Sequence, residues 1–287
     1  MTNPDILQLR DFLLKEAQGD LLPCVAQMAA AERFNLSLHD VEEAALEMGL
    51  LPARYQRNRH CISTLQQYTL FRSRAVVIGC GGLGGYVIEE LARLGVGNLV
   101  LIDHDVIEEH NLNRQILSSA DVLNRPKVDV AFERVNAINP AINVTPLKTH
   151  FLHDNGRELV EGADVVIDGL DTIPARMELA QICHEMSVPV VHGAIGGWYG
   201  QVATQLPGEN ISPQIFGMTP PIKGIETDLG NPSFTPGVIA SLQVAEACKI
   251  LLREGRCLSR RILFINLLDM EIIEVKSEKR GKNRTDR

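Results

Sequence analysis

The sequence has 287 residues, of which 45% are hydrophobic and 22% charged, and its formal net charge is −8. A chain of this length can bury a substantial core, and its acidic balance argues against nucleic acid as the main partner. No segment approaches the roughly 18 apolar residues of a membrane span, the first residues lack the pattern of a secretory signal, and the six cysteines form no C-x-x-C pair. We therefore expect a cytoplasmic protein without a disulfide framework.

Residues 1–52 are predicted to form a helical extension, because their apolar residues recur at helical spacing. The three expected helices run through Leu7, Leu9, Phe12 and Leu13, through Val25, Met28 and Ala29, and over residues 40–49. Residues 1–50 carry nine acidic and three basic side chains, a net charge of −6, which repels the phosphates of a nucleic acid. We expect this extension to pack on the rest of the chain, to form a dimer contact or to dock a protein, rather than to bind DNA.

A basic stretch over residues 53–59 follows the extension. It contains Arg54, Arg57 and Arg59, whose side chains suit phosphate binding. By itself the stretch is more typical of a solvated linker.

The next segment reads as a strand, a glycine turn, a helix and a second strand. Ala75–Ile78 is an apolar run typical of a strand buried on both faces. The G-x-G-x-x-G pattern that follows lets the backbone turn sharply and directs free N–H groups of a helix toward a phosphate. Gly79, Gly81 and Gly84 make this pattern, with Gly82 and Gly85 added to it. Asp103 ends the second strand, 19 residues after Gly84, where Rossmann-type sites hold ribose hydroxyls. This order predicts a nucleotide site.

Further polar residues follow the carboxyl ends of predicted strands, where open α/β sheets bind ligands. After Asp103 these are Asp105, Asn111, Arg114 and Gln115. Lys127 lies in the first turn of a helix predicted over residues 125–138, where the helix dipole opposes a cation unless an anion is nearby. Asp168 and Asp171 end a strand predicted over residues 163–172 and suit sugar or Mg²⁺ binding, although Asp168 is equally typical of a turn cap.

The remaining elements continue this alternation of strands and helices. We expect strands at 142–146, 188–192, 201–206, 262–266 and 270–275, helices at 174–186 and 237–252, and a glycine-rich turn at 193–200. Residues 207–236, with six prolines, are predicted to form a long functional or mobile loop, and residues 276–287 a disordered basic tail. The predicted fold over residues 53–275 is α/β and Rossmann-like, with a mostly parallel central sheet continued by antiparallel strands.

The cations near the predicted phosphate site bear on which nucleotide is bound. A dinucleotide needs the glycine turn and the ribose acid, because one helix end serves its pyrophosphate. A dinucleotide site would not need Arg114, Lys127 or Asp171. Two cations and a carboxylate suited to Mg²⁺ match a triphosphate whose reaction develops charge on a leaving pyrophosphate, so the residues favour ATP over NAD.

Together these motifs resemble the ThiF/MoeB/HesA family, relatives of the ubiquitin-activating enzymes, over about residues 54–275. The matching segments are residues 79–84, 103–105, 111–115, 126–127, 168–171 and 237–246. The resemblance implies Mg-ATP-dependent adenylation of the C-terminal glycine of a small ubiquitin-like sulfur carrier protein, with release of pyrophosphate. Carriers of this kind end in Gly-Gly and serve molybdenum or tungsten cofactor, thiamine and cysteine pathways.

The resemblance also implies a role for each matching residue. The glycines of residues 79–84 would form the nucleotide turn and Asp103 would hold the ribose. Asp171 would contact Mg²⁺, and Arg57 matches an arginine that the family inserts into the neighbouring subunit's site, which implies a homodimer. Residues expected around the phosphates are Asp105, Asn111, Arg114 and Lys127, with Gln115 beside them.

The sequence departs from the family pattern in its cysteines. Many members carry two C-x-x-C pairs that bind zinc, but the place of the first pair falls near residues 212–215 and the tail has no cysteine. Zinc is therefore predicted to be absent. The loop also lacks a cysteine for a thioester or persulfide, and Cys183 and Cys248 lie on apolar helix faces typical of buried packing. We expect adenylation without covalent transfer of the carrier, with a separate sulfur donor.

Three other interpretations remain open. A tRNA-modifying relative would activate a small carboxylate on RNA, which the acidic charge disfavours and the basic tail allows. An NAD(P)-dependent oxidoreductase would use the same glycine turn. A non-catalytic module that binds a ubiquitin-like protein would not need to keep Arg57, Arg114, Lys127 and Asp171.

Overall fold

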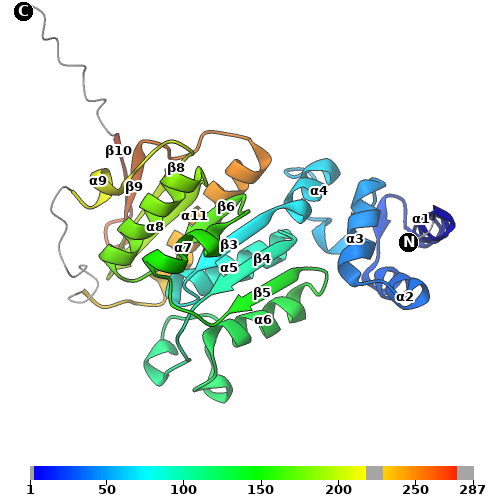
Figure 1. Ribbon diagram of the computed structural model, residues 1–287, viewed down its shortest axis with the longest axis horizontal. Coiled ribbons are helices and arrows are strands. Elements are labelled where there is room, and N and C mark those ends of the chain that lie inside the picture. The colour runs from blue at the N-terminus through cyan, green and yellow to red at the C-terminus, as the bar shows by residue number, and fades with distance from the viewer. Residues whose placement is uncertain (1–2, 218–228, 277–287) are drawn as a thin grey trace, which may run out of the picture.

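The computed structural model describes residues 3–217 and 229–276. Its centre is an eight-stranded sheet in the order β10-β9-β8-β7-β6-β3-β4-β5, with helices on both faces (Figure 1). The strands are β3 (Arg74–Ile78), β4 (Asn98–Ile102), β5 (Asn143–Leu147), β6 (Val165–Asp168), β7 (Val190–Gly196), β8 (Tyr199–Gln205), β9 (Arg261–Asn266) and β10 (Glu271–Lys276). Strands β3 to β7 are parallel, whereas β8, β9 and β10 pair antiparallel. The prediction of a parallel sheet with an antiparallel continuation is confirmed.

The parallel strands are apolar because helices cover both of their faces. Val77 and Leu101 pack into the cluster that contains α5 (Gly82–Leu94), α6 (Lys127–Ile138) and α11 (Phe234–Leu252), whereas Val76 and Val100 pack against α7 (His153–Val160) and α8 (Ile173–Met186). Successive residues of a strand point to opposite faces, so such a strand needs apolar residues at every position. The remaining helices of this part are α4 (Thr64–Arg72), the short α9 (Ser212–Ile215) and the 3₁₀ turns at Ala53–Tyr55, Glu109–Asn111 and Ala120–Val122.

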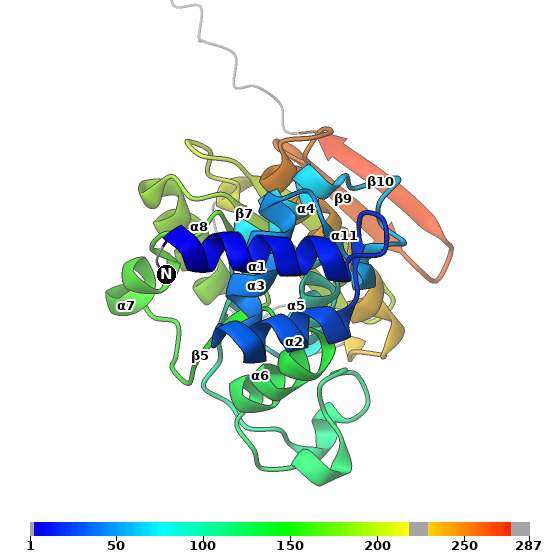
Figure 2. The same cartoon turned by 90° about the vertical axis from the view of Figure 1, so that its right-hand side faces the viewer.

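The amino-terminal residues form a group of helices at one end of the molecule (Figure 1). It contains α1 (Asn3–Glu16), α2 (Cys24–Phe34) and α3 (Leu38–Glu47), and a short parallel pair of strands, β1 (Leu21–Leu22) and β2 (Leu51–Pro52). Figure 2 shows α1 and α2 lying side by side over the rest of the chain. These elements share a small core of their own, which includes Leu9, Leu13, Ala26, Ala30 and Val41.

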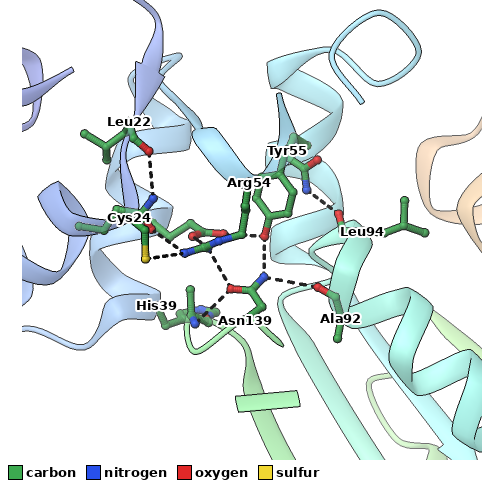
Figure 3. A network of polar contacts seen from close by, with 12 residues as sticks. Leu22, Cys24, His39, Arg54, Tyr55, Ala92, Leu94 and Asn139 are labelled. Carbon is green, nitrogen blue, oxygen red and sulfur yellow. Dashed lines mark hydrogen bonds and ion pairs between the residues drawn. The ribbon is translucent and has the colours of Figure 1, made fainter. Parts of the chain in front are cut away.

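A buried polar network joins these helices to the nucleotide-binding fold (Figure 3). The Arg54 guanidinium pairs with the fully buried Glu42 carboxylate of α3 and donates to Asn139 Oδ1 at 2.9 Å. The Tyr55 hydroxyl donates to Glu42 Oε1 at 2.8 Å and accepts from Asn139 Nδ2 at 2.7 Å. Because Asn139 ends α6, one connected set of side chains links the extension, the basic stretch and the sheet's helical layer. Arg54 is therefore a structural residue and not a phosphate ligand.

The structure differs from the sequence-based expectation at the surface of the extension. Leu7, Val25 and Met28 were expected on the buried helix faces, but they are 60%, 74% and 57% exposed. The interior face of α2 instead carries Ala26 and Ala30, because small side chains let α2 pack closely on its neighbours. Leu9 and Leu13 of the first expected helix are buried, so the amphipathic pattern holds there in part.

The region after α8 also differs from the expected pattern. The glycine-rich segment at 193–200 is not a turn: β7 runs on to Gly196, reverses at Gly197 and Trp198, and returns as β8. Within the predicted loop at 207–236, α9 is helical and α11 already begins at Phe234, while residues 218–228 lie outside the described part. Helix α7 was not predicted, and the predicted disordered tail lies almost entirely in residues 277–287, which are also outside the described part.

Among the described helices, α11 is long and apolar enough to cross a membrane by length and composition alone. Half of this apolar segment is buried, and the helix packs against β7, β8 and α5. Its inward face includes the buried side chains of Gln243 and Glu246, both of which are hydrogen bonded to the sheet or its loops. Helix α11 thus has the environment of a core helix.

Replacing Arg54 tests the buried network. We expect Arg54→Ala to lower the free energy of unfolding by about 3 kcal/mol or more, because Glu42 would remain buried without its cation. Arg57→Ala is the matched control: this exposed arginine should change stability by less than about 0.5 kcal/mol. Urea denaturation of both variants gives the comparison, and equal stability of the two would show that the network contributes nothing.

Replacing Gly84 tests the packing of the glycine turn. A Cβ at Gly84 would lie 1.7 Å from the Gly79 carbonyl oxygen, whereas a Cβ at Gly82 would meet no atom closer than 3.8 Å. Gly84→Ala should therefore cost about 3 kcal/mol of stability, and Gly82→Ala less than about 1 kcal/mol. Thermal unfolding measures both, and an unimpaired Gly84→Ala protein would contradict the packing described above.

Candidate active site

A cleft of about 310 Å³ opens at the carboxyl ends of β3, β4 and β6. The chain leaves β3 through α5 toward β4 on one side, whereas β6 lies on the other side of β3. Such a change of direction leaves a crevice between the diverging loops, which is where open α/β sheets bind ligands. The cleft is lined by the glycine turn and by the loops that follow β4 and β6.

The glycine turn forms the floor of the cleft. Gly79 has φ +93°, and a Cβ on it would lie 2.4 Å from the Gly169 carbonyl oxygen. The backbone of the loop after β6 is thus in direct contact with the turn, and Gly169 N–H donates to the Ile78 carbonyl at 2.8 Å. Only glycine allows this conformation and this approach at position 79. The first turn of α5 starts at Gly82 and directs unpaired N–H groups into the cleft.

Asp103 supports the turn from the end of β4. Its Oδ2 accepts a hydrogen bond from Cys80 N–H at 2.7 Å, and its Oδ1 accepts one from Asp105 N–H at 2.8 Å. The carboxylate is largely buried and lines the cleft. Each oxygen keeps a further lone pair, so Asp103 can brace the turn and accept a hydrogen bond from a ribose hydroxyl at the same time.

Lys127 and Asp105 form an ion pair inside the cleft. The Lys127 ammonium, although at the start of α6, donates to Asp105 Oδ2 at 2.8 Å and is mostly buried. Burial alone would raise the pKa of the Asp105 carboxyl, but the neighbouring Lys127 outweighs it and holds that pKa below its usual value. A cation in the first turn of a helix needs a nearby anion, and the Asp105 carboxylate of the same chain is that anion. A bound phosphate can share this cation.

Two buried side-chain oxygens at the cleft lack a partner among the described residues. They are Gln115 Oε1 and Asn231 Oδ1, and both residues line the cleft. Buried polar atoms are nearly always hydrogen bonded, so these two oxygens indicate room for a donor on a ligand. Asn111 is used differently, because its Oδ1 caps the loop by accepting from Glu108 N–H at 3.0 Å.

Arg114 and Asp171 present charge to the cleft from opposite loops. The Arg114 guanidinium donates only to neutral oxygens, at His110 and Asn113, and has no carboxylate partner in the described residues. The Asp171 side chain is exposed, and no hydrogen bond or ion pair engages it in the described part of the chain. By contrast, Asp168 is buried, and its Oδ1 accepts from Leu170 N–H at 3.0 Å. The sequence allowed Asp168 to be either a ligand for sugar or Mg²⁺ or a turn cap, and the structure shows the turn cap.

All but two of the predicted site residues line this cleft. The lining residues among them are Gly79, Gly81, Gly82, Asp103, Asp105, Asn111, Arg114, Gln115, Lys127 and Asp171. Gly84 lies beneath the turn and packs on Gly79. Arg57 is exposed on the basic stretch and does not line the cleft of its own chain, while its neighbour Arg59 pairs with Asp20.

Several residues that the sequence did not predict also line the cleft, among them Arg176, His104 and Asn231. Arg176 lines it and donates to the Gly193 carbonyl at 2.8 Å, His104 stacks on His150 with ring centroids 3.4 Å apart, and Asn231 comes from the long loop. Arg176 lies in the first turn of α8, so the dipole argument that drew attention to Lys127 applies to it equally. Neither His104 nor Asn231 carries a comparable signal in the sequence.

The buried Cys80 and Cys183 and the partly exposed Cys248 are poor nucleophiles. Burial raises the pKa of the Cys183 thiol to about 12 and that of Cys248 to about 11. Cys80, in the glycine turn, is fully buried, and burial together with Asp103 raises its pKa as well. Thiolates are the reactive form of cysteine, so these three side chains serve packing.

Comparison with known proteins agrees with this geometry. Residues 55–285 match the ThiF family. The chain is 39% identical over 207 residues to the SAMP-activating enzyme E1 of Haloferax volcanii, covering 71% of this chain and 76% of that protein. It is 32% identical over 215 residues to the molybdopterin-synthase adenylyltransferase of Haemophilus influenzae, covering 73% and 87%. The crystal structure of E. coli MccB shares the fold with a TM-score of 0.66 at 20% identity, covering 91% of this chain and 86% of that one. On its sequence and fold, this chain is an adenylyltransferase that belongs to the ThiF family.

Proposed function

We propose that this protein uses ATP and Mg²⁺ to adenylate the C-terminal glycine of a small ubiquitin-like sulfur carrier protein, releasing pyrophosphate. The observation that carries the proposal is that Arg114 and Asp171 both line one cleft beside a glycine turn, and that neither has an oppositely charged partner among the described residues. The relatives named above support the substrate class, since one activates SAMP and another acts on molybdopterin synthase.

The cleft residues fit a nucleoside triphosphate. The N–H groups at the start of α5 and the Lys127 ammonium serve phosphate oxygens, and Asp103 serves the ribose. The unpartnered oxygens of Gln115 and Asn231 offer acceptors to groups of the ligand. Arg114 supplies a cation that no carboxylate of the described chain neutralises.

The donor set also fits Mg²⁺. This ion takes oxygen ligands and is often held by one or two carboxylates together with substrate phosphates and water. Asp171 is an exposed carboxylate at the cleft, so it would be the protein ligand. When bound there, the ion would neutralise charge that develops on the phosphates.

The reaction needs positioning more than it needs a nucleophile from the enzyme. A terminal carboxylate oxygen of the carrier forms a bond to the α-phosphorus, the bond from that phosphorus to the bridging oxygen of the pyrophosphate breaks, and pyrophosphate leaves with the electron pair. Negative charge grows on the transferring group, and Arg114 and Lys127 are placed to stabilise it.

Since the thiols of Cys80, Cys183 and Cys248 are not activated, we propose that sulfur comes from a separate donor. We also propose that the protein is cytoplasmic and works without zinc. Metal analysis of the purified protein would check whether zinc is bound.

Removing the Asp171 carboxylate tests the reaction. In an ATP–pyrophosphate exchange assay with Mg²⁺ and a small carrier ending in Gly-Gly, we expect Asp171→Ala to lose about a hundredfold or more of the exchange rate. Its circular dichroism and melting temperature should be unchanged, because the side chain is exposed. Asp11→Ala, which removes an exposed carboxylate of α1, should behave as the wild type.

The choice of carriers identifies the pathway. Carriers of the molybdenum cofactor, thiamine and SAMP type should be compared in parallel, and the one that supports exchange marks the substrate. A wild-type protein that binds ATP but shows no exchange with any carrier would refute the proposal and favour a tRNA-modifying or non-catalytic role.

We also propose that the protein is a homodimer in which Arg57 enters the partner's cleft. Arg57 is exposed and remote from the cleft of its own chain, so only a second copy would bring it to the phosphates. Arg57→Ala and Asp171→Ala should each be inactive alone. Mixed under conditions that exchange subunits, they should recover about a quarter of wild-type activity, because half of the dimers would carry one intact site. Absence of recovery in confirmed mixed dimers would exclude the shared site.

A further inference from the structure

A cluster of buried polar side chains lies behind the loop that carries Asp171. Asp168, the last residue of β6, and His192, its register partner within the neighbouring strand β7, are 2% and 3% exposed. His192 Nδ1 and Asp168 Oδ2 are 2.7 Å apart, and His192 Nε2 lies 3.2 Å from the Gln201 amide nitrogen of β8. Neither residue lines the cleft, so the proposed reaction leaves this pair without a role.

The contacts of His192 fix the protonation state and the tautomer of its imidazole ring. Burial lowers the pKa of His192, against the opposing effect of Asp168, so the ring is neutral near pH 7. A neutral imidazole has one N–H donor and one acceptor nitrogen. The Asp168 carboxylate accepts from Nδ1–H, and Nε2 accepts from the Gln201 amide, so both partners select the same tautomer.

Asp168 passes this restraint to the turn that ends in Asp171. Its second oxygen, Oδ1, accepts from Leu170 N–H at 3.0 Å, and the buried Arg176 guanidinium donates to the Leu170 carbonyl on the other side. The turn is therefore held through both polar groups of the Leu170 backbone. Asp171 has no side-chain partner of its own in the described structure, so the position of this backbone sets the region that its carboxylate can reach.

Apolar residues cover the cluster on the side away from the cleft. The Phe216 ring meets His192 edge-on at 5.6 Å between centroids, and Ile211 and Ile215 border the same small cavity. This cavity has only about 10 Å³ of space, about the minimum that a single water molecule needs. In so dry an environment the His192–Asp168 hydrogen bond is strong, and losing either partner would leave the other unsatisfied.

We propose that His192 is a positioning residue that, by orienting Asp168, holds the turn so that the Asp171 carboxylate can receive the Mg²⁺ of the bound nucleotide. This inference rests on the function proposed above for Asp171. Groups that orient metal ligands from behind commonly affect metal affinity or activity by 10- to 100-fold when they are removed. If His192 served only packing, replacing it with an apolar side chain of similar volume would leave metal affinity and activity unchanged.

Two substitutions separate these roles. His192→Asn keeps an amide N–H near the position of Nδ1 and can still donate to Asp168, whereas His192→Leu keeps bulk and removes the donor. The first readout is ATP affinity by calorimetry with and without Mg²⁺, and the second is the Mg²⁺ concentration that half-saturates ATP–pyrophosphate exchange. We expect the gain in ATP affinity on adding Mg²⁺ to be at least about tenfold smaller for the leucine variant than for the wild type, and its exchange to need at least about tenfold more Mg²⁺ for half-saturation. Its ATP affinity without Mg²⁺ should be unchanged, and the asparagine variant should lie within about twofold of the wild type.

The controls make every outcome decisive. Asp171→Asn should lose the effect of Mg²⁺ on ATP affinity, which shows that the measurement reports on this carboxylate. If the leucine variant is unfolded, His192→Gln replaces it, because its longer amide extends toward Gln201 instead of Asp168. Wild-type Mg²⁺ dependence in the leucine or glutamine variant, or equal impairment of the asparagine variant, would overturn the inference. If the wild type binds MgATP but catalyses no exchange, the proposed function is refuted. The calorimetric comparison of the His192 variants still tests whether His192 positions the Asp171 turn.

Discussion

The cleft depends on the contact between three glycine backbones at the carboxyl ends of β3 and β6. Gly84 lies against the Gly79 carbonyl, and Gly79 lies against Gly169, each at a distance that excludes a Cβ atom. This packing brings the start of α5 and the loop after β6 to one point, so that free N–H groups and the Asp171 carboxylate face the same space. A methyl group at Gly79 or Gly84 would push the two loops apart and separate the groups proposed to bind phosphate from the carboxylate proposed to bind Mg²⁺.

The charges around this point are divided between structural and free groups. Asp168, Arg176 and Asp103 are buried and use their polar atoms on the backbone of the two loops. Lys127 and Asp105 neutralise each other in the absence of a ligand. Arg114 and Asp171 remain to meet a substrate, since no opposite charge in the described residues pairs with either. Buried charges are tolerated when they are paired, so the paired groups hold the two loops in place, and Arg114 and Asp171 are the groups proposed to act on the substrate.

The three arginines of the basic stretch show how neighbouring residues of one type can differ in role. Arg54 enters the network with Glu42, Tyr55 and Asn139 and fastens the amino-terminal helices to α6. Arg59 pairs with Asp20 of the extension, and Arg57 is exposed. Two of the three thus tie the extension to the nucleotide-binding fold, which fixes the position from which Arg57 points outward.

The order of motifs along the chain was enough to predict the sheet, the glycine turn and ten of the residues that line the cleft, because strand, turn and helix signals are local and parallel strands bring their carboxyl ends to one edge. Local patterns could not predict that residues 193–200 form a hairpin, since the glycines there are accommodated by pairing with β8 and by the approach of Gln243 and Ile239 of α11. Nor could they show that Val25 and Met28 face outward, because burial depends on which face of α2 meets its neighbours. Lys127 pairs with Asp105, 22 residues away, Asp168 with His192, 24 residues away, and Arg54 with Glu42, 12 residues away. Which charge is neutralised inside the protein and which stays free for a ligand is decided by such distant contacts, and these exist only once the chain has folded.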